Sequence, residues 1–585
     1  MAPRLRPAAA ALLGVDALRV VFRARVPAVS PRTNAVGPGQ TLTAVKAAPA
    51  PLRYNCAMPP PAATVPSGAR FAPRHPDAAP SAASVSASAL QPARGWFLFA
   101  IGSLVLAGLL SLMLVVGRLP FLGWLFTDPL FFKRALVVHV DLAIVVWFQA
   151  GTLAFLGLAL GPRLHRGVTA AALALAAAGV VGLLVGALMP GAQPVLSNYV
   201  PVIDHPIFFG GLIAWFTGAG LFFALALATP SRTDAKALAA DVVIALRASA
   251  AANLLALVTF LGAWQTTPES VPGVFYELVF WGGGHVLQTA NVAAMLALWL
   301  HLLHRGTGRP VLAPIVATAL LAALVLPQVV MPPLAFGGTT ATSYFSMATH
   351  LMRWTIFPVV LVVLVLATVH VGRHRAAVAW RDYRFIGLAG SVALTLLGFI
   401  LGALIRGSST LVPGHYHCAI GAVTIALMAA AYDFCADVAP QGAAPETPRR
   451  ARLQLLLFGG GQAVFGLGFA LAGAYGLGRK QYGAEQHVRS LGEYFGLSVM
   501  GLGGFVAVAG GILFLAVMLR RIGAWRRDFS RVPPPSMNNE PEKHPWQKVL
   551  DNPWLLLVLG VLIPVLSYTV WGWIELTLTQ PALLP

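Results

Sequence analysis

The sequence predicts an all-α protein that crosses a membrane about 12–13 times. Of its 585 residues, 57% are hydrophobic and only 10% are charged, and the mean hydropathy is +0.75. A soluble domain carries about 25% charged residues, so a water-soluble globule is disfavoured. The same composition excludes disorder as the main state, because disordered chains have low hydrophobicity. Apolar runs of membrane length follow one another, and runs of about 20 residues fit helices, the usual way to satisfy the backbone in lipid.

The first part of the chain, residues 1–93, is a low-complexity extension rich in Ala, Pro and Arg, with no apolar run of membrane length. An Arg-rich, acid-poor leader resembles an organelle transit peptide, and the composition also fits a disordered tail. A third interpretation is that translation starts later, at Met58 or beyond. We favour the tail or the later start, and none of the three places chemistry in this segment.

The remaining chain consists of predicted spans. Twelve of them fill a core at residues 94–520, a cytoplasmic loop follows at 521–551, and one more span lies in the segment 552–585. The candidate spans lie near 95–117, 134–160, 168–190, 206–228, 248–265, 274–300, 311–331, 346–370, 384–405, 413–434, 453–476, 493–519 and 552–575. No sequence repeat with a period of about 20–50 residues, as found in repeat proteins, occurs along residues 94–520.

The basic residues predict the topology. Lys and Arg number 40 against 20 Asp and Glu, a formal charge of +20. They gather in the loops after the even-numbered spans, and the other loops are nearly free of them apart from the first loop and Arg479-Lys480. By the positive-inside rule the N-terminus is cytoplasmic. No basic patch interleaved with aromatics suggests nucleic acid as a partner. Cys56, Cys418 and Cys435 cannot form a disulfide framework, and no Cys-x-x-Cys-His motif for a c-type haem is present.

Four histidines lie inside predicted spans, where ionisable residues are costly and indicate function. His139, His285, His415 and His417 all occur early in even-numbered spans, so we expect them at similar depth in the outer half of the membrane. His415 and His417 are two residues apart, about 200° around a helix, so one helix could serve two metals or two haems. Imidazole suits iron, copper and zinc. The alternative is that each histidine bonds to a neighbouring helix.

The segment Gly414-His415-Tyr416-His417-Cys418 resembles the tenth helix of subunit I of the haem–copper oxidase superfamily, nearest the cbb3 and nitric oxide reductase branches. The resemblance implies that His415 binds a high-spin haem, and that His417 and His139 bind a low-spin haem from two sides. The run from Phe280 to His285 resembles the helix-six motif whose histidine binds the active-site copper.

Arg479 and Lys480 match the basic pair that holds the haem propionates in that family. Such fixed cations stabilise the carboxylates of a haem edge. An ordinary loop charge is the alternative.

The expected copper site is incomplete. Pro332-Pro333 stands where the resemblance requires two adjacent histidines, and proline offers no ligand. His285 alone is a poor site, since a catalytic metal usually has three protein ligands. His350 could substitute, or could be an interfacial hydrogen-bonding residue. Copper is therefore doubtful, and His285 is at most a remnant ligand.

The tyrosine of oxidase active sites also has no counterpart, because Thr289 occupies the turn after His285 and the seventh span contains no tyrosine. We expect structural roles for the other polar residues of this region: Glu277 at the outer interface, Gln288 and Asn291 in helix packing, and Asp204 and His205 as caps of the fourth span.

The resemblance implies a respiratory oxidase subunit I of the cytochrome c oxidase type in a bacterial inner membrane, part of the electron transport chain of aerobic respiration. It would carry two haems, b-type by the resemblance, toward the outer face, with His285 and His415 as catalytic residues. Its partners would be an electron donor (cytochrome c, a cupredoxin-like subunit or quinol) and other oxidase subunits. One alternative is a diverged member without copper, acting in electron transfer, sensing or nitric oxide reduction. An alternative of another class is a transporter with a histidine proton relay, which predicts broken helices and internal repeats.

Overall fold

The computed structural model describes residues 90–125, 128–230, 238–270, 274–439, 448–481 and 485–529. The chain divides into two compact units, Met1–Arg521 and Ile522–Pro585, and the packing described below belongs to the first. The predicted extension at 1–93, apart from its last residues, and the predicted span near 552–575 lie outside the described residues.

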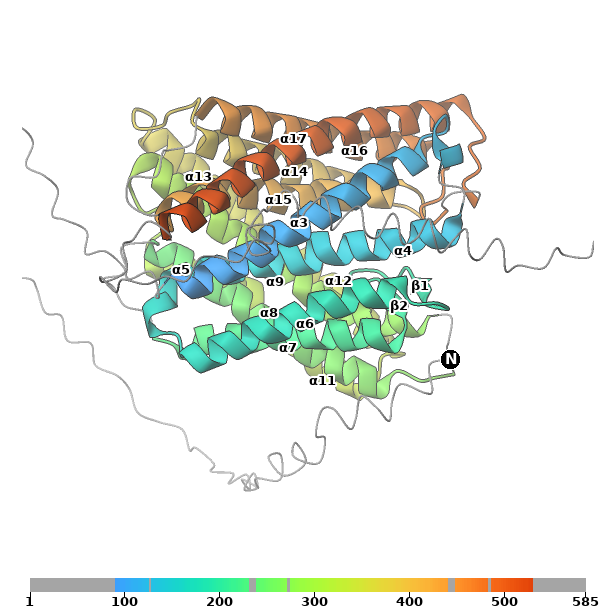
Figure 1. Ribbon diagram of the computed structural model, residues 1–585, viewed down its shortest axis with the longest axis horizontal. Helices are drawn as coiled ribbons and strands as arrows, with labels where there is room; N and C mark the ends of the chain where they lie inside the picture. Colours follow the sequence, from blue (N-terminus) through green and yellow to red (C-terminus); the bar gives the residue numbers. More distant parts are fainter. Residues whose placement is uncertain are drawn as a thin grey trace, which may run out of the picture. The chain divides into compact units, whose positions relative to one another are not determined.

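Long apolar helices make up the first unit, and they confirm the predicted fold class. Within the described ranges, 12 helices are long and apolar enough to cross a membrane. Figure 1 shows them running roughly along one direction. Their elements are α3 (Gln91–Arg118), α4 (Pro129–Val140), α5 (Trp147–Leu160), α6 (Arg166–Leu188), α7 (Pro206–Ala228), α8 (Ala240–Thr266), α9 (Phe275–Thr307), α10 (Pro314–Val325), α11 (Met331–Gly337), α12 (Thr342–Leu351), α13 (Phe357–Arg373), α14 (Tyr383–Leu404), α15 (Leu411–Asp437), α16 (Pro448–Ala474) and α17 (Leu491–Phe529).

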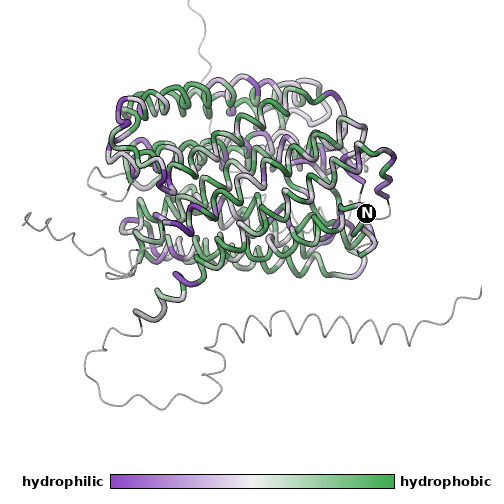
Figure 2. Tube along the Cα trace, turned by 90° about the horizontal axis from the view of Figure 1, so that it is seen from above, coloured by the Kyte–Doolittle hydropathy of each residue, from purple (hydrophilic) through white to green (hydrophobic). Residues whose placement is uncertain are grey.

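The hydropathy of the chain follows this arrangement. Figure 2 shows hydrophobic residues along the middle of the helices and hydrophilic residues gathered toward the two ends of the bundle. A membrane protein needs this distribution, because polar groups are costly in the hydrocarbon core and favourable at its interfaces. The chain is therefore an integral membrane protein.

Three of the spans contain short segments that are not α-helical. A π-helical segment, η3 (Asp141–Val146), joins α4 to α5, and another, η6 (Met352–Ile356), joins α12 to α13. A 3-10 segment, η5 (Leu326–Val330), joins α10 to α11. Such segments inside helices are frequent at functional sites, and η3 begins two residues after His139.

The outer end of the bundle is defined here as the end at which α4, α9 and α15 begin, which the predicted topology places outside. A hairpin of two strands lies between α6 and α7, with β1 (Gln193–Val195) antiparallel to β2 (Val202–Asp204). His205 follows β2 and caps α7, because its Nδ1 accepts a hydrogen bond from the backbone N–H of Ile207 at 3.3 Å. Of the two predicted caps of this span, His205 is confirmed, whereas Asp204 accepts a hydrogen bond from the hydroxyl of Tyr276.

Small residues let the helices approach closely, as is common in membranes. A Cβ atom on Gly468 of α16 would lie 2.5 Å from the Cα of Met500 in α17, and a Cβ on Gly179 of α6 would lie 2.5 Å from the backbone N of Trp215 in α7. By contrast, Gly460 of α16 has nothing within 4 Å of its Cβ position.

These contacts predict that Gly468→Val destabilises the bundle by about 1–3 kcal/mol, because the new side chain forces α16 away from α17. Gly460→Val, on the same helix but facing open space, should change stability by no more than about 0.5 kcal/mol. Unfolding of the purified protein in mixed micelles with increasing SDS measures both. Equal effects of the two substitutions would contradict the close packing.

Candidate functional site

His139 lies in the last turn of α4, at the point where the π segment η3 follows. Its Nδ1 is 2.9 Å from the carbonyl oxygen of Ala107 in α3. A carbonyl can only accept, so Nδ1 carries the proton and Nε2 has a free lone pair. Nε2 receives no hydrogen bond from any described residue. This is the arrangement of metal-binding histidines, in which one nitrogen donates to a carbonyl and the other faces the metal.

His417 of α15 lies close to His139. Its ring packs edge-on against Phe465, with centroids 4.7 Å apart, and nearly parallel to Phe469 at 5.9 Å. The imidazole of His139 and the guanidinium of Arg118 are both within electrostatic range of it. The structure thus brings together two histidines that are 278 residues apart in the sequence, as their matching depth predicted. Two half-buried imidazoles and two aromatic rings thus lie together at this end of α15.

His415 faces a different neighbour. Its Nδ1 lies 2.7 Å from the carbonyl oxygen of Gly398 in α14, so Nε2 is again the free nitrogen. His417 packs against α16 instead, which agrees with the angle predicted for two residues two positions apart. A Cβ on Gly402 would lie 2.7 Å from Nδ1 of His415, so glycine at this position is needed for the ring to fit.

Arg479 and Lys480 have different environments. Arg479 donates from Nη2 to Oδ1 of Asn198 at 3.0 Å, and its buried Nε has no partner among the described residues. Nζ of Lys480 lies 3.9 Å from Glu277, which agrees with the predicted interfacial place of Glu277. Burial lowers the pKa of Lys480, and the neighbouring Arg479 lowers it further, while the Glu277 carboxylate acts in the opposite direction. Arg479 is therefore the more firmly held cation of the pair.

Arg118, at the end of α3, is a cation of this region that the sequence analysis did not assign. It is only 6% exposed, its guanidinium lies 5.5 Å from the centroid of Phe469, and its Nη2 donates to the carbonyl of Arg479 at 3.2 Å. The sequence did contain an indication, because the first outer loop departs from the charge pattern of the other outer loops. A buried arginine beside His417 explains part of that departure.

His285 of α9 is 3% exposed and has both ring nitrogens engaged. Nδ1 lies 2.8 Å from the carbonyl oxygen of Trp281, and Nε2 lies 2.9 Å from the hydroxyl of Tyr199. The sixth and seventh spans indeed offer no tyrosine at His285, but Tyr199 reaches it from the loop between β1 and β2, which the sequence analysis did not consider. A copper ion would need the nitrogen that Tyr199 now occupies, so the donor set at His285 does not fit this metal.

The segment before His285 explains this close approach. Positions 282, 283 and 284 are all glycine, and a Cβ at each would collide with a different side chain. The neighbours are Tyr344 and Met331 at position 282, Phe260 at 283 and Tyr199 at 284. The fully buried Met331 fills the place beside Pro332 where the resemblance requires histidine ligands. Across the described ranges, no group of three or more His, Cys, Asp or Glu could hold a metal ion.

His350 does not replace the missing ligands. Its Nδ1 is 2.6 Å from the carbonyl oxygen of Ser346 one turn earlier, and the residue is exposed. It lines a cavity of about 410 Å³ together with Trp281, Arg353 and hydroxyl side chains of α12. The structure therefore places His350 near the indole of Trp281 and not in contact with Nε2 of His285.

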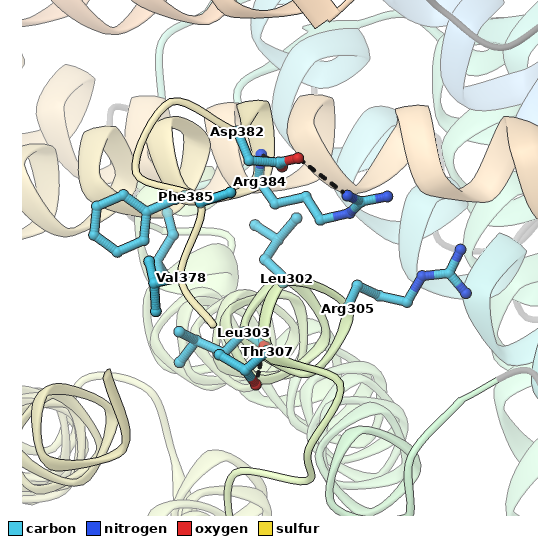
Figure 3. Close-up of a pocket in the computed structure, with 11 residues that line it drawn as sticks. Leu302, Leu303, Arg305, Thr307, Val378, Asp382, Arg384 and Phe385 are labelled. Carbon is cyan, nitrogen blue, oxygen red and sulfur yellow. Dashed lines mark hydrogen bonds and ion pairs between the residues drawn. The ribbon is translucent and has the colours of Figure 1, made fainter. Parts of the chain in front are cut away.

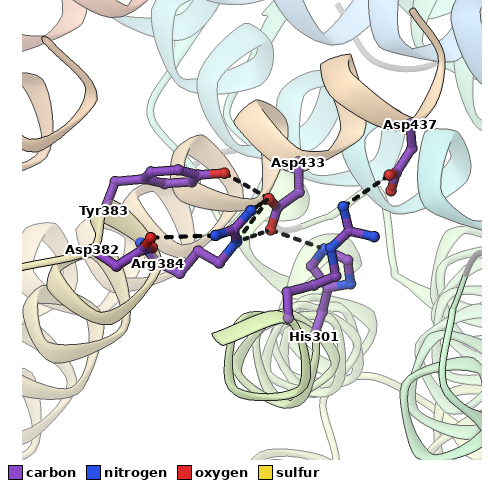
Figure 4. Close-up of polar contacts among 7 residues, drawn as sticks. His301, Asp382, Tyr383, Arg384, Asp433 and Asp437 are labelled. Atoms are coloured by element: carbon purple, nitrogen blue, oxygen red, sulfur yellow. Dashed lines mark hydrogen bonds and ion pairs between the residues drawn. The ribbon is translucent and has the colours of Figure 1, made fainter. Parts of the chain in front are cut away.

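A second polar cluster lies at the opposite end of α9, α14 and α15 (Figure 4). Asp433 is fully buried and binds Arg384 at 2.6 Å, the hydroxyl of Tyr383 at 2.6 Å and Nε2 of His301 at 3.4 Å. These contacts join three helices through one carboxylate. Nothing in the sequence pattern predicted them.

The same end of the bundle contains a small cavity of about 60 Å³ (Figure 3). Its lining includes Leu302, Arg305, Asp382 and Phe385, and Arg305 reaches away from α9 to pair with Asp437 at 2.9 Å. The cavity is too small for a cofactor, so the ion pairs here connect helices and leave room only for solvent.

Comparisons with known proteins identify two relatives by sequence and one solved structure with a similar fold. No protein family model matches the chain. An uncharacterized protein of Aquifex aeolicus (strain VF5) is 28% identical over 59% of this chain and 84% of its own length. An uncharacterized protein of Rickettsia prowazekii (strain Madrid E) is 24% identical over 73% of this chain and 94% of its own length. A solved structure of a heme-copper terminal oxidase dimer matches with a TM-score of 0.53 at 15% identity, covering 78% of this chain and 86% of that one.

This likeness establishes the fold of the chain, which is that of a haem–copper terminal oxidase. It confirms the predicted resemblance at the level of architecture. At 15% identity the likeness does not assign roles to single residues, which follow from the geometry above.

The buried cluster leads to a prediction about stability. Asp433→Ala should cost about 3–5 kcal/mol, because it leaves the Arg384 guanidinium without its buried counter-charge. Asp437→Ala, which removes a partly buried partner of Arg305 on the same helix, should cost about 1 kcal/mol or less. Unfolding in SDS compares the two variants. A loss for Asp433→Ala no larger than that for Asp437→Ala would show that the cluster does not connect the three helices.

Proposed function

We propose that this protein is a haem-carrying electron-transfer subunit of the haem–copper oxidase type. A low-spin haem would be held between His139 and His417, and a second haem would be held by His415. The observation that carries the proposal is the meeting of two half-buried imidazoles from α4 and α15, one of them already oriented by a carbonyl hydrogen bond. The sequence has no Cys-x-x-Cys-His motif for a c-type haem, and the resemblance implies that both haems are b-type.

The residues around the histidines fit such a group. Phe465 and Phe469 offer flat apolar contacts beside His417, and the hydrogen bonds of His139 and His415 fix the rings so that Nε2 can meet an iron. Arg118 and Arg479 lie at the outer end, where the propionates of a haem would find cations. A haem iron at this place supplies one-electron redox chemistry, with a potential set by its axial ligands and surroundings.

The fold suggests the path of electrons through the protein but not the details of the reaction. Electrons would enter at the low-spin site from cytochrome c, a cupredoxin-like subunit or quinol, and would pass to the haem on His415. Reduction of oxygen is what the likeness to a terminal oxidase suggests. The mismatch at His285 favours a diverged member, acting in electron transfer, sensing or nitric oxide reduction. We place it in a bacterial inner membrane with other oxidase subunits, its N-terminus cytoplasmic and its haem sites outside.

The transporter alternative receives less support. The π and 3-10 segments of three spans are short, and α-helix continues on both sides of each. A histidine proton relay would also need histidines that hydrogen-bond to one another or through water, whereas His139 and His415 donate to backbone carbonyls.

The proposal predicts about two haems per chain in protein purified from haem-replete cells, with a Soret band and the signals of a bis-imidazole low-spin iron. His139→Ala or His417→Ala should remove the low-spin signals and lower the content to about one, because one axial ligand is lost. His415→Ala should remove the other haem and keep the low-spin signals.

His350→Ala is the matched control, since His350 is an exposed histidine of the same end of the bundle and should change neither haem. Optical and electron paramagnetic resonance spectra with haem quantification measure all four variants. A colourless wild-type protein, or unchanged haem content in the His139 and His417 variants, would overturn the proposal.

A further inference from the structure

We infer that His285 belongs to a metal-free tyrosine–histidine site, in which the hydroxyl of Tyr199 takes the position that a copper ion would need. The inference rests on the contacts around α9 and is independent of the haem ligands. Its test measures copper and tyrosine hydrogen bonding, whereas the proposed function is tested by haem content, so the two can fail separately.

The hydrogen bonds of His285 determine its tautomer. The carbonyl of Trp281 accepts from Nδ1 at 2.8 Å, so the proton of the neutral ring is on Nδ1. Nε2 is then an acceptor, and the phenol of Tyr199 donates to it at 2.9 Å. The only lone pair that could bind a metal is thus used. A copper ion would have to displace the phenol and leave a buried hydroxyl without a partner, which is unfavourable.

Tyr199 remains a donor in this position. Burial raises the pKa of its hydroxyl well above the ordinary value, and the carboxylate of Glu277 raises it further, while Arg479 acts against them. The phenol is therefore protonated at neutral pH and can donate to Nε2.

The loop that carries Tyr199 is built to hold the ring in place. Tyr199 has a φ of +67°, a left-handed conformation that is uncommon for residues other than glycine. The residues on either side stabilise it: Glu277 accepts a hydrogen bond from the backbone N–H of Asn198 at 3.0 Å, and Ser197 donates to the carbonyl of Val200 at 2.6 Å. Such a conformation persists only when its surroundings determine it.

The surroundings of Gly282 leave no room for the two further ligands that a copper site at His285 would need. Beside Gly282, the hydroxyl of Tyr344 accepts from the backbone N–H of Gly282 at 2.9 Å and donates to the carbonyl of Leu278 at 3.0 Å. The side chain of Met331 packs on the same glycine. Two further imidazoles would have to replace these buried groups, and the sequence offers Pro332-Pro333 in their place.

The first experiment measures copper. The full chain is produced with copper in the medium, purified, and analysed by mass spectrometry for copper and haem in one sample. We expect far less than one copper per chain in the wild type, and no change in His285→Ala. About one copper per chain that is lost in His285→Ala and kept in His350→Ala would overturn the inference.

The second experiment detects the hydrogen bond itself. Infrared or ultraviolet resonance Raman spectra of protein with isotope-labelled tyrosine should contain one band that Tyr199→Phe removes. His285→Ala should shift this band, because the phenol loses its acceptor, and His285→Gln should restore much of it through the amide oxygen.

Tyr276→Phe is the matched control, because the hydroxyl of Tyr276 donates to Asp204 at 2.9 Å nearby and should be insensitive to His285. A Tyr199 band that does not respond to His285→Ala would contradict the pairing. Unchanged helical circular dichroism and unchanged unfolding in SDS show that the same variants fold.

Discussion

The scarcity of water inside a bilayer constrains the buried polar side chains of this protein, because a polar group left unpaired there is costly. In the histidines, the hydrogen bonds that satisfy buried nitrogens also orient the rings. His139 and His415 donate to carbonyls of Ala107 and Gly398 on neighbouring helices, and the same bonds that pay for burial also fix the rings with Nε2 available. His285 meets the requirement at both nitrogens and keeps nothing for a metal. The difference in chemistry between these sites thus follows from the number of hydrogen bonds each ring makes.

The sequence was sufficient for the architecture. Apolar runs, the depth of four histidines and the His-x-His spacing depend only on residues that are close in the sequence. They can therefore be read before it is known which helices are neighbours. The meeting of His139 and His417 could be anticipated because both residues lie at one depth on spans that the resemblance makes neighbours. Contacts between residues that no periodicity relates could not be anticipated: Asp433 with Arg384 depends on which helix faces which, and the sequence alone does not give that information.

Tyr199 illustrates the same difficulty more sharply. It lies in a loop, 86 residues before its partner, and outside the sixth and seventh spans, where the resemblance locates the tyrosine. The available indication was the glycine triplet before His285. Three adjacent glycines in a buried helix imply that other parts of the chain come unusually close, although they do not say which. Arg118 had a comparable indication in the charge of the first loop, where a cation on the outer side required an explanation.

The π segment between α4 and α5 has a further consequence. One extra residue in a helix turns everything before it by about 100° relative to everything after it. A helical wheel that treats the whole span as one α-helix therefore gives the wrong angle between His139 and the residues from Trp147 onward. The segment Asp141–Val146 thus shifts the helical phase within the span. His139 on α4 lies near His417 of α15 at an angle to α5 that a continuous α-helix would not give it, while every residue of α5 is buried.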